Sequence, residues 1–279
     1  MAEAVLPGHS RFVLRRPGLV LSVLLLAAVL IAAFAPGLFT GQDPITGVPA
    51  ERLQGPSLAH LFGTDETGRD VFARVVHGAG LSLRATVLAV VVAFLAGSAL
   101  GLLAGFRGGW LEAVVMRVVD VLQAVPAILL SLALVTSLGF GTTNVAIAVG
   151  VANLAAFARL MRAEVLRVRS GVFVEAARAS GVRWAGVLGR HVLPNALGPV
   201  LVLATVTVGT AVLEVSALSF LGFGAGPPTP EWGALVAGGR NFLATAWWMT
   251  TFPGLTVAAV VLAANRLSRA LDGERSERR

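Results

Sequence analysis

Long apolar runs separated by short polar segments dominate this chain. A helix needs about 20 mostly apolar residues to cross a bilayer. Runs of about this length occupy residues 18–35, 81–106, 111–138, 142–162, 194–220 and 248–267. The pattern therefore predicts an all-α polytopic membrane protein with six transmembrane helices. Pro126 lies inside the third run and predicts a kink there, which a membrane helix tolerates when neighbouring groups satisfy the freed carbonyl.

The polar segments divide the chain into three parts. Residues 1–80 hold a polar N-terminal segment, the first transmembrane helix and a loop that begins near residue 40. Residues 81–271 hold the other five predicted helices and a polar loop at 163–193. Residues 272–279 form a charged tail that we expect to fray. The loop at 222–247 carries three prolines close together, which predicts a rigid, extended segment.

The first apolar run has two interpretations. Basic residues precede it, as they precede the apolar core of a cleavable signal peptide. The run is longer than a typical signal-peptide core, and no clear small-residue cleavage site follows it. We therefore favour a retained membrane anchor.

Composition excludes several classes of protein. The 279 residues are 56% hydrophobic and 13% charged, which is far too apolar for a soluble domain of this size. The chain has no cysteine, which excludes disulfides, thiolate metal ligands and a cysteine nucleophile. It also has no lysine, so it cannot form the Gly-Lys-Ser/Thr end of a nucleotide-hydrolysing P-loop. The four histidines are scattered and show no zinc or triad spacing, so we expect no enzyme and no cofactor.

The arginines predict the orientation in the membrane. The segments 1–17, 106–117, 159–193 and 266–279 hold all but five of the 22 basic residues. Cytoplasmic loops of membrane proteins carry such an excess of positive charge. We therefore expect both termini and the loop at 163–193 to be cytoplasmic, and the loops at 40–80 and 222–247 to lie outside. The net charge of +7 then reflects topology and does not indicate a nucleic-acid partner.

The cytoplasmic loop carries an ordered motif. Glu175, Ala176 and Ala177 are followed after three residues by Gly181, and His191, Leu193 and Pro194 close the segment. Two short helices fit it, one over 172–180 that ends before a left-handed Gly181, and one over 183–192. The second helix repeats apolar residues at i, i+3, i+4 and i+7, namely Trp184, Val187, Leu188 and His191. It is therefore expected to lie against another surface.

The spacing resembles the EAA motif of the membrane subunits of ABC importers. In that family the loop forms a coupling helix that docks into a groove of a cytoplasmic ATPase. The resemblance implies that Ala176 and Ala177 allow close approach, that Glu175 accepts from a cationic partner and that Gly181 provides the bend. A simpler interpretation also exists, because Glu-Ala-Ala is a good helix start anywhere and glycine is an ordinary helix stop.

A second motif ends the first outer loop. It comprises Gly63, Thr64, Asp65, Gly68, Arg69 and Asp70. Thr67 and Asp70 have the spacing of a capping box, which predicts an amphipathic helix through Phe72, Val75, Val76 and Ala79. The same string resembles a signature that precedes the second span in C-type permeases of the dipeptide, oligopeptide and nickel importers. Helix capping is the alternative and would account for these residues without any further role.

Further stretches extend this resemblance over most of the chain. They are Met116-Arg117 with Asp120 and Pro126, Ala158-Arg159, Glu214 with residues 218–222, residues 227–233 and residues 252–255. One departure lies at the end, where Asn265 to Asp272 is about one helical turn shorter than is usual in such subunits. It changes the expected geometry of the C-terminal cytoplasmic helix.

The resemblance implies a permease subunit of an ABC importer with the type I transmembrane fold in the plasma (inner) membrane. Its implied partners are membrane lipid, a second homologous permease subunit, one or two cytoplasmic ABC ATPases and an extracytoplasmic substrate-binding protein. ATP hydrolysis would then belong to the partner ATPases. The resemblance implies that the solute is a peptide, nickel or a related small molecule. The choice among these stays open, because the path lies between two subunits and one chain does not define it.

Asp120 and Glu214 are acids within or near the predicted spans. Ionised groups in hydrocarbon cost several kcal/mol, so such residues are functional candidates. We expect Asp120 to pair locally with Arg117, three residues earlier. We expect Glu214 to be a structural acid that faces the partner subunit. The alternative class is a secondary transporter or channel that uses these acids as ion or proton sites, but such a protein does not need the Glu175 loop.

Overall fold

The computed structural model describes residues 17–276, with side chains up to residue 270. This part of the chain is helical and contains no strand. Its helices are α2 (Pro17–Phe34), α3 (Val71–Arg107), α4 (Gly109–Ala124), α5 (Ala127–Leu138), α6 (Thr142–Arg169), α7 (Val172–Ala179), α8 (Trp184–Val187), α9 (Leu193–Phe220), α10 (Trp232–Gly239) and α11 (Trp248–Ser276). Short 3-10 turns lie at Pro36–Leu38, Pro49–Glu51 and Arg240–Phe242, and a π turn lies at Leu188–Val192.

Within the described residues, five helical runs are long and apolar enough to cross a membrane. They are α2, α3, α6, the run Trp184–Phe220 and the part Trp248–Ala270 of α11. The sixth span is the pair α4 and α5, if these two are counted together. The all-α, polytopic prediction is confirmed.

The third span was expected to be one kinked helix, and this expectation is wrong. Helices α4 and α5 meet at 97°, with Val125 in an extended conformation between them. A residue that precedes proline disfavours the helical region, and proline has no N–H to continue the hydrogen-bond ladder. The amides of Leu129 and Leu130 bond back to the carbonyl of Pro126, so a new helix starts there.

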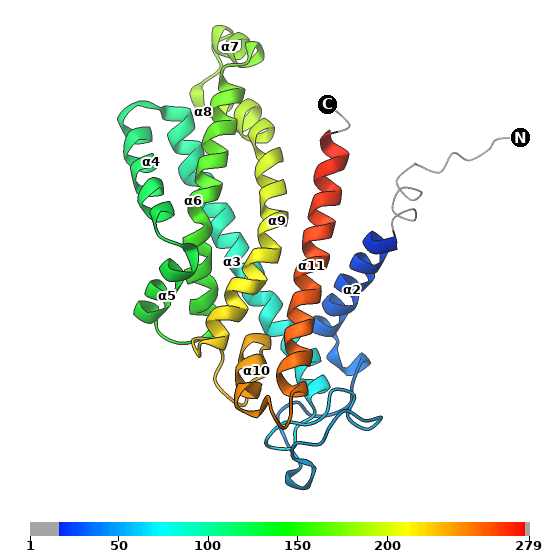
Figure 1. Ribbon diagram of the computed structural model, residues 1–279. Coiled ribbons are helices and arrows are strands. Elements are labelled where there is room, and N and C mark those ends of the chain that lie inside the picture. Colours follow the sequence, from blue (N-terminus) through cyan, green and yellow to red (C-terminus); the bar gives the residue numbers. More distant parts are fainter. Residues whose placement is uncertain (1–16, 277–279) are drawn as a thin grey trace, which may run out of the picture.

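Helix α6 is the centre of the bundle, with α3 packed along it (Figure 1). Gly97, Gly101 and Gly105 place small residues on the α3 side of this contact, one turn apart. A Cβ at Gly101 would collide with the carbonyl oxygen of Ala158 on α6. Small residues let the backbones of membrane helices approach closely. Phe157, Met161 and Val165 on α6 are consequently fully buried.

The molecule has two distinct ends (Figure 1). Helices α7 and α8 and the C-terminal end of α11 lie at one end, where the Arg266 guanidinium packs over Gly18 at the start of α2. The loop between α2 and α3 lies at the other end with α10. Within the described residues, the segments that the arginine count assigns to opposite sides thus lie at opposite ends of the bundle (Figure 1).

Several helix boundaries differ from those expected. Helix α3 begins at Val71, so the amphipathic helix and the second span, expected from residue 81, are one helix. The helix expected over 183–192 is not separate either, because α8, the π turn and α9 form one continuous run, Trp184–Phe220. Helix α6 extends to Arg169, past the expected end at residue 162.

The two later polar segments also contain more helix than expected. The loop at 222–247 is not simply extended, because it holds α10 and the turn Arg240–Phe242. Helix α11 continues to Ser276, so residues 272–276 are helical where fraying was expected. Residues 277–279 and the N-terminal residues 1–16, which include the three arginines before the first span, lie outside the described residues.

Candidate functional site

Helix α7 carries the Glu-Ala-Ala motif and ends in a left-handed turn. The Gly181 amide donates to the Arg178 carbonyl at 3.0 Å and the Val182 amide to the Ala177 carbonyl at 3.1 Å. Gly181 has φ of +79°. This pair of bonds is the Schellman C-cap, in which a residue without Cβ avoids the cost of the left-handed conformation. The turn at Gly181 has the conformation that the sequence predicts.

Most of α7 is uncovered in this chain. Val174 is its one fully buried side chain, and it packs in a cluster with Phe157, Val187 and Val192. Val172 is 80% exposed, and Glu175 and Ala176 are also exposed. The Glu175 carboxylate has no hydrogen-bond or ion-pair partner among the described residues. The helix therefore presents an apolar and acidic surface that a second protein can cover.

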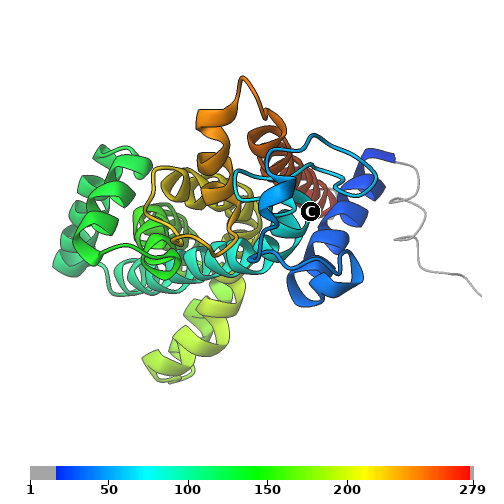
Figure 2. The same cartoon turned by 90° about the horizontal axis from the view of Figure 1, so that it is seen from below.

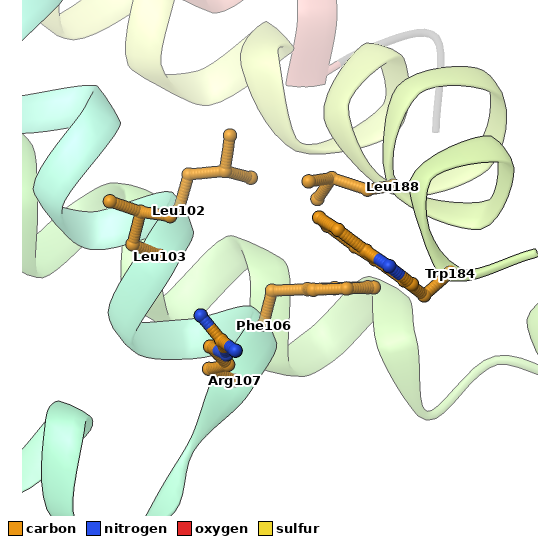
Figure 3. A pocket seen from close by; sticks show the side chains of 6 residues that line it. All are labelled: Leu102, Leu103, Phe106, Arg107, Trp184 and Leu188. Carbon is orange, nitrogen blue, oxygen red and sulfur yellow. The ribbon is translucent and has the colours of Figure 1, made fainter.

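The segment after Gly181 forms the junction between α7 and the membrane helices. Val187 is buried and Leu188 is half-buried, as the apolar periodicity predicts. Trp184 is 70% exposed, and its ring centroid lies 6.3 Å from that of Phe106 on α3. A cavity of about 320 Å³ opens here, lined by Leu102, Leu103, Phe106, Arg107, Trp184 and Leu188 (Figure 3). The predicted apolar face thus lies against α3, but it does not fill the space beside it.

The rest of the motif opens α9. His191 lies in the π turn, with its ring 6.5 Å from that of Phe173 on α7. Leu193 and Pro194 are the first residues of α9 and directly follow the π turn, where the Leu193 amide donates to the Leu188 carbonyl. Both arms of the motif therefore border one junction, between the exposed helix α7 and the long helix α9.

The outer motif forms a compact polar cluster around Asp65. This carboxylate accepts from the Thr67 amide and hydroxyl at 2.8 Å each, from the Arg69 amide at 3.0 Å and from the Arg69 Nε at 2.6 Å. Burial acts to raise the pKa of Asp65, but these hydrogen bonds outweigh it and hold the pKa below its ordinary value. The Arg74 guanidinium lies 3.7 Å away and adds a second cation. Asp65 is therefore an ionised centre that fixes the loop.

The backbone conformation at two positions of the outer motif requires glycine. Gly63 and Gly68 have φ of +71° and +80°. A Cβ at Gly68 would collide with the Val48 carbonyl, and one at Gly63 would lie 2.6 Å from the Gln54 carbonyl oxygen. Thr64 links the loop to α11, because its carbonyl accepts from the Trp248 indole at 3.0 Å. The motif thus joins two distant parts of the chain.

The predicted capping box at Thr67 and Asp70 is wrong. Asp70 is itself the N-cap of α3, and its Oδ1 accepts from the Ala73 amide at 2.6 Å. Its Oδ2 lies 2.9 Å from the His60 Nδ1. The Thr67 side chain is bound to Asp65 instead. The motif does cap a helix, as the alternative interpretation held, but the N-cap is Asp70, three residues after the position that the capping box requires.

Sequence reasoning missed Glu231, which is fully buried at the start of α10. Its carboxylate accepts from the Gly233 amide at 3.1 Å and the Ala234 amide at 3.2 Å, and the Ser82 hydroxyl donates to it at 3.4 Å. Burial raises the pKa of Glu231, and these hydrogen bonds offset part of that effect. The resemblance over residues 227–233 marked this stretch, but no local pattern indicated that the acid is buried against α3.

The two intramembrane acids pair across helices. Asp120 on α4 bonds the Arg159 Nη2 on α6 at 2.8 Å, so the expected local pair with Arg117 is wrong. The packing of α4 on α6 brings these side chains together. Glu214 on α9 accepts from the Asn153 Nδ2 on α6 at 2.6 Å. Within the described residues no group of three or more His, Asp or Glu side chains is arranged to hold a metal.

The fold is that of the transmembrane subunits of ABC importers. An inward-facing structure of the MetNI methionine ABC transporter has a TM-score of 0.57 and 24% identity, over 71% of this chain and 96% of that one. An amino acid ABC transporter crystallised with histidines has a TM-score of 0.56 and 16% identity, over 73% of this chain and 94% of that one. At these identities the likeness establishes the fold alone.

Sequence comparison establishes the family. Residues 97–276 match the family described as "Binding-protein-dependent transport system inner membrane component". The dipeptide transport system permease DppC of Alkalihalophilus pseudofirmus is 43% identical over 249 residues, which are 89% of this chain and 82% of that protein. The glutathione transport system permease GsiD of Pectobacterium atrosepticum is 39% identical over 252 residues, 90% of this chain and 83% of that protein. The chain belongs to this family of ABC importer inner-membrane permeases.

Proposed function

We propose that this chain forms, with a second homologous permease subunit, the translocation path of an ATP-driven importer for short peptides or related small solutes. The exposed helix α7 carries this proposal. It is held by one buried side chain and a left-handed turn, and it displays Glu175, Ala176 and Ala177 at the end of the molecule opposite the outer motif. A transporter that works alone has no need for such a helix.

The two ends of the molecule indicate where the proposed partner proteins would bind. One or two cytoplasmic ABC ATPases would bind α7, with the loop up to Asn195 transmitting their closure to α9. An extracytoplasmic binding protein would deliver solute at the opposite end, where the outer motif lies. The arginine count supports a multi-pass protein with both termini cytoplasmic. We propose to divide the chain into three parts. Residues 1–80 are the N-terminal segment, the first transmembrane helix and the loop that follows it. Residues 81–271 are a transmembrane domain with its coupling loop at 163–193, and residues 272–279 are a tail.

The solute class rests on the relatives. Their names assign them dipeptides, di- or tripeptides and glutathione. All three solutes are short peptides with at least one carboxylate and one amine. We therefore propose short zwitterionic peptides as the solutes delivered to this chain.

Uptake into vesicles tests the proposed function. The chain would be reconstituted with the permease, ATPases and binding protein that are encoded and purified with it, and uptake of labelled dialanine would be measured. We expect uptake to require ATP on the ATPase side and to ignore an imposed proton gradient, both in the native chain and in Glu214→Gln. Uptake driven by the gradient alone would instead support the secondary transporter.

A further inference from the structure

The exposed side chains of α3 all lie in one row. The row runs from Arg84 to Arg107 at a spacing of three or four residues, and it winds slowly around the helix. Between the two arginines it contains only apolar side chains, namely Val87, Val91, Leu95, Ala99 and Leu103. Residues 85–106 rise about 33 Å along the helix, and the hydrocarbon core of a bilayer is about 30 Å thick. The row therefore has the length and the composition of a lipid-facing surface, with a cation at each end.

The cavity between α3 and α8 lies at the Arg107 end of this row. Leu103 and Arg107 belong both to the row and to the lining of the cavity. Leu102 on α3 and Leu188 in the π turn face each other across it (Figure 3). Its volume of about 320 Å³ is at the lower end of the range for ligand pockets, about 300–1,000 Å³. An apolar chain that lies along the row on α3 can therefore extend into the cavity.

The lining of the cavity also carries hydrogen-bond donors without acceptors. Within the described residues, the Arg107 guanidinium and the Trp184 Nε1 have no hydrogen-bond or ion-pair partner. A further cation lies close by, because the Arg169 Nη1 donates to two carbonyls in the last turn of α3. The acid at the start of α4, Glu112, is already bound to the Arg162 Nε at 2.6 Å. The polar side of the cavity is therefore suited to an anion such as a phosphate group.

We propose that this cavity binds an anionic phospholipid of the cytoplasmic leaflet, with one acyl chain inside the cavity and the phosphate at Arg107 and Trp184. Basic pockets between membrane helices on the cytoplasmic side bind such headgroups, and tryptophan is enriched at this depth of the membrane. A lipid fits better than a protein partner because the cavity continues the row of bilayer length on α3. The assignment takes the leaflet from the proposed orientation and is independent of the solute.

The proposed lipid would bridge two elements that move separately if the cavity is empty. One is the last turn of α3, and the other is α8, which leads from the left-handed turn at Gly181 to α9. The site would thus place a membrane lipid beside the segment that carries α7.

Lipid binding to the purified complex tests this site. The complex would be stripped of lipid in detergent and titrated with dioleoyl phosphatidylglycerol or dioleoyl phosphatidylcholine, with native mass spectrometry to count the bound lipid. Since one arginine at a lipid surface contributes about fivefold in affinity, we expect phosphatidylglycerol to bind at least that much more tightly. Excess inorganic phosphate should leave this binding unchanged, because it has no acyl chain. Equal affinities for the two lipids, or displacement by phosphate alone, would overturn the assignment.

Two matched pairs of variants locate the bound lipid. Arg107→Gln removes the cation at the cavity, and Arg84→Gln removes the cation at the other end of the row. Leu103→Trp fills the cavity from an exposed position, and Leu95→Trp adds the same bulk about two turns away. We expect Arg107→Gln and Leu103→Trp each to weaken phosphatidylglycerol binding about fivefold or more. The two control variants should bind it as the native complex does, and all four should keep the native melting temperature.

The variants also separate this site from the other occupants of such a surface. Equal losses in Arg107→Gln and Arg84→Gln would mean that both arginines only anchor α3 at the membrane surface. Unchanged binding in Arg107→Gln and Leu103→Trp would mean that protein covers the cavity. Either result would overturn the site. Uptake of dialanine by the native complex is measured separately, so the proposed function would still stand.

Discussion

Glu231 ties the loop that follows α9 to the membrane helices. Its carboxylate caps α10 and accepts from Ser82 on α3, while the neighbouring Trp232 donates its indole N–H to the Val75 carbonyl at 2.9 Å. A buried acid with satisfied oxygens positions a loop well, but its charged form is costly to bury. The protonation state of Glu231 therefore affects how strongly this loop is held against α3.

Two substitutions separate the cap from the charge. Glu231→Gln keeps an acceptor and removes the charge, so we expect thermal unfolding at neutral pH to stay the same or shift upward. Glu231→Ala removes the cap and leaves buried donors unpaired, which costs about 1–3 kcal/mol. The test is the melting temperature of each purified variant. A loss in Glu231→Gln as large as that in Glu231→Ala would show that the ionised form is required.

The pH dependence has a definite sign. The pKa of Glu231 in the folded protein is raised above its ordinary 4.5, so the unfolded chain releases the proton first. Stability then falls as the pH rises above 4.5 and through the folded pKa. We expect native protein to melt at a lower temperature at pH 8 than at pH 5, and Glu231→Gln to lose most of this difference. An unchanged pH dependence in the variant would contradict the assignment to Glu231.

Local pattern predicts single residues only where the partner is close in the sequence. The left-handed Gly181 was predictable because a helix stop is a local event. The partner of Asp120 was not, because Arg159 is 39 residues away on another helix. The N-cap of α3 was predicted at Thr67 but lies at Asp70, because the Thr67 hydroxyl donates to Asp65 and does not cap the helix. Burial of Glu231 depends on contacts with α3 and left no local signal.

At the scale of elements, the length of an apolar run predicts the presence of a helix more reliably than it predicts the position at which that helix breaks. The runs at 18–35 and 194–220 correspond closely to α2 and α9 (Figure 2). Pro126 was placed correctly as the weak point of the third run, but the size of the bend depends on how α4 and α5 each pack against α6. The merging of α8 with α9 through a π turn had no signal in the apolar pattern.

The α3–α6 contact gives a prediction at this scale. Gly101→Ala would place a methyl group against the Ala158 carbonyl on α6, and overpacking of this kind costs about 1–3 kcal/mol. Gly254→Ala is the matched control, since it lies inside α11 with open space where its Cβ would be. We expect the purified Gly101→Ala protein to melt several degrees lower, and Gly254→Ala to melt at the native temperature or above. Equal melting temperatures would mean that the two helices are not in close contact.

At the scale of the whole molecule, the orientation is open to a direct test. Ser57 and Thr229 are exposed at the end with the outer motif, and Ser170 is exposed beside α7. Cysteine at each position should leave folding intact, because all three side chains are exposed. We expect an impermeant maleimide to label Ser57→Cys and Thr229→Cys in intact cells, and to label Ser170→Cys only after the cells are opened. The reverse pattern would invert the proposed topology.

The central claim is that α7 couples a partner ATPase to transport, and Gly181 is the place to measure it. Valine at this left-handed position costs about 1–2 kcal/mol and displaces α7, while the membrane helices stay folded. Gly189→Ala is the matched control, because its φ is not positive and its Cβ would meet nothing within 4 Å. The measurement is ATP hydrolysis by the reconstituted complex with and without peptide-loaded binding protein. We predict that Gly181→Val reaches the membrane at native levels but shows no stimulated hydrolysis and no uptake, while Gly189→Ala keeps both. Normal stimulation and uptake in Gly181→Val would show that α7 is only a surface helix.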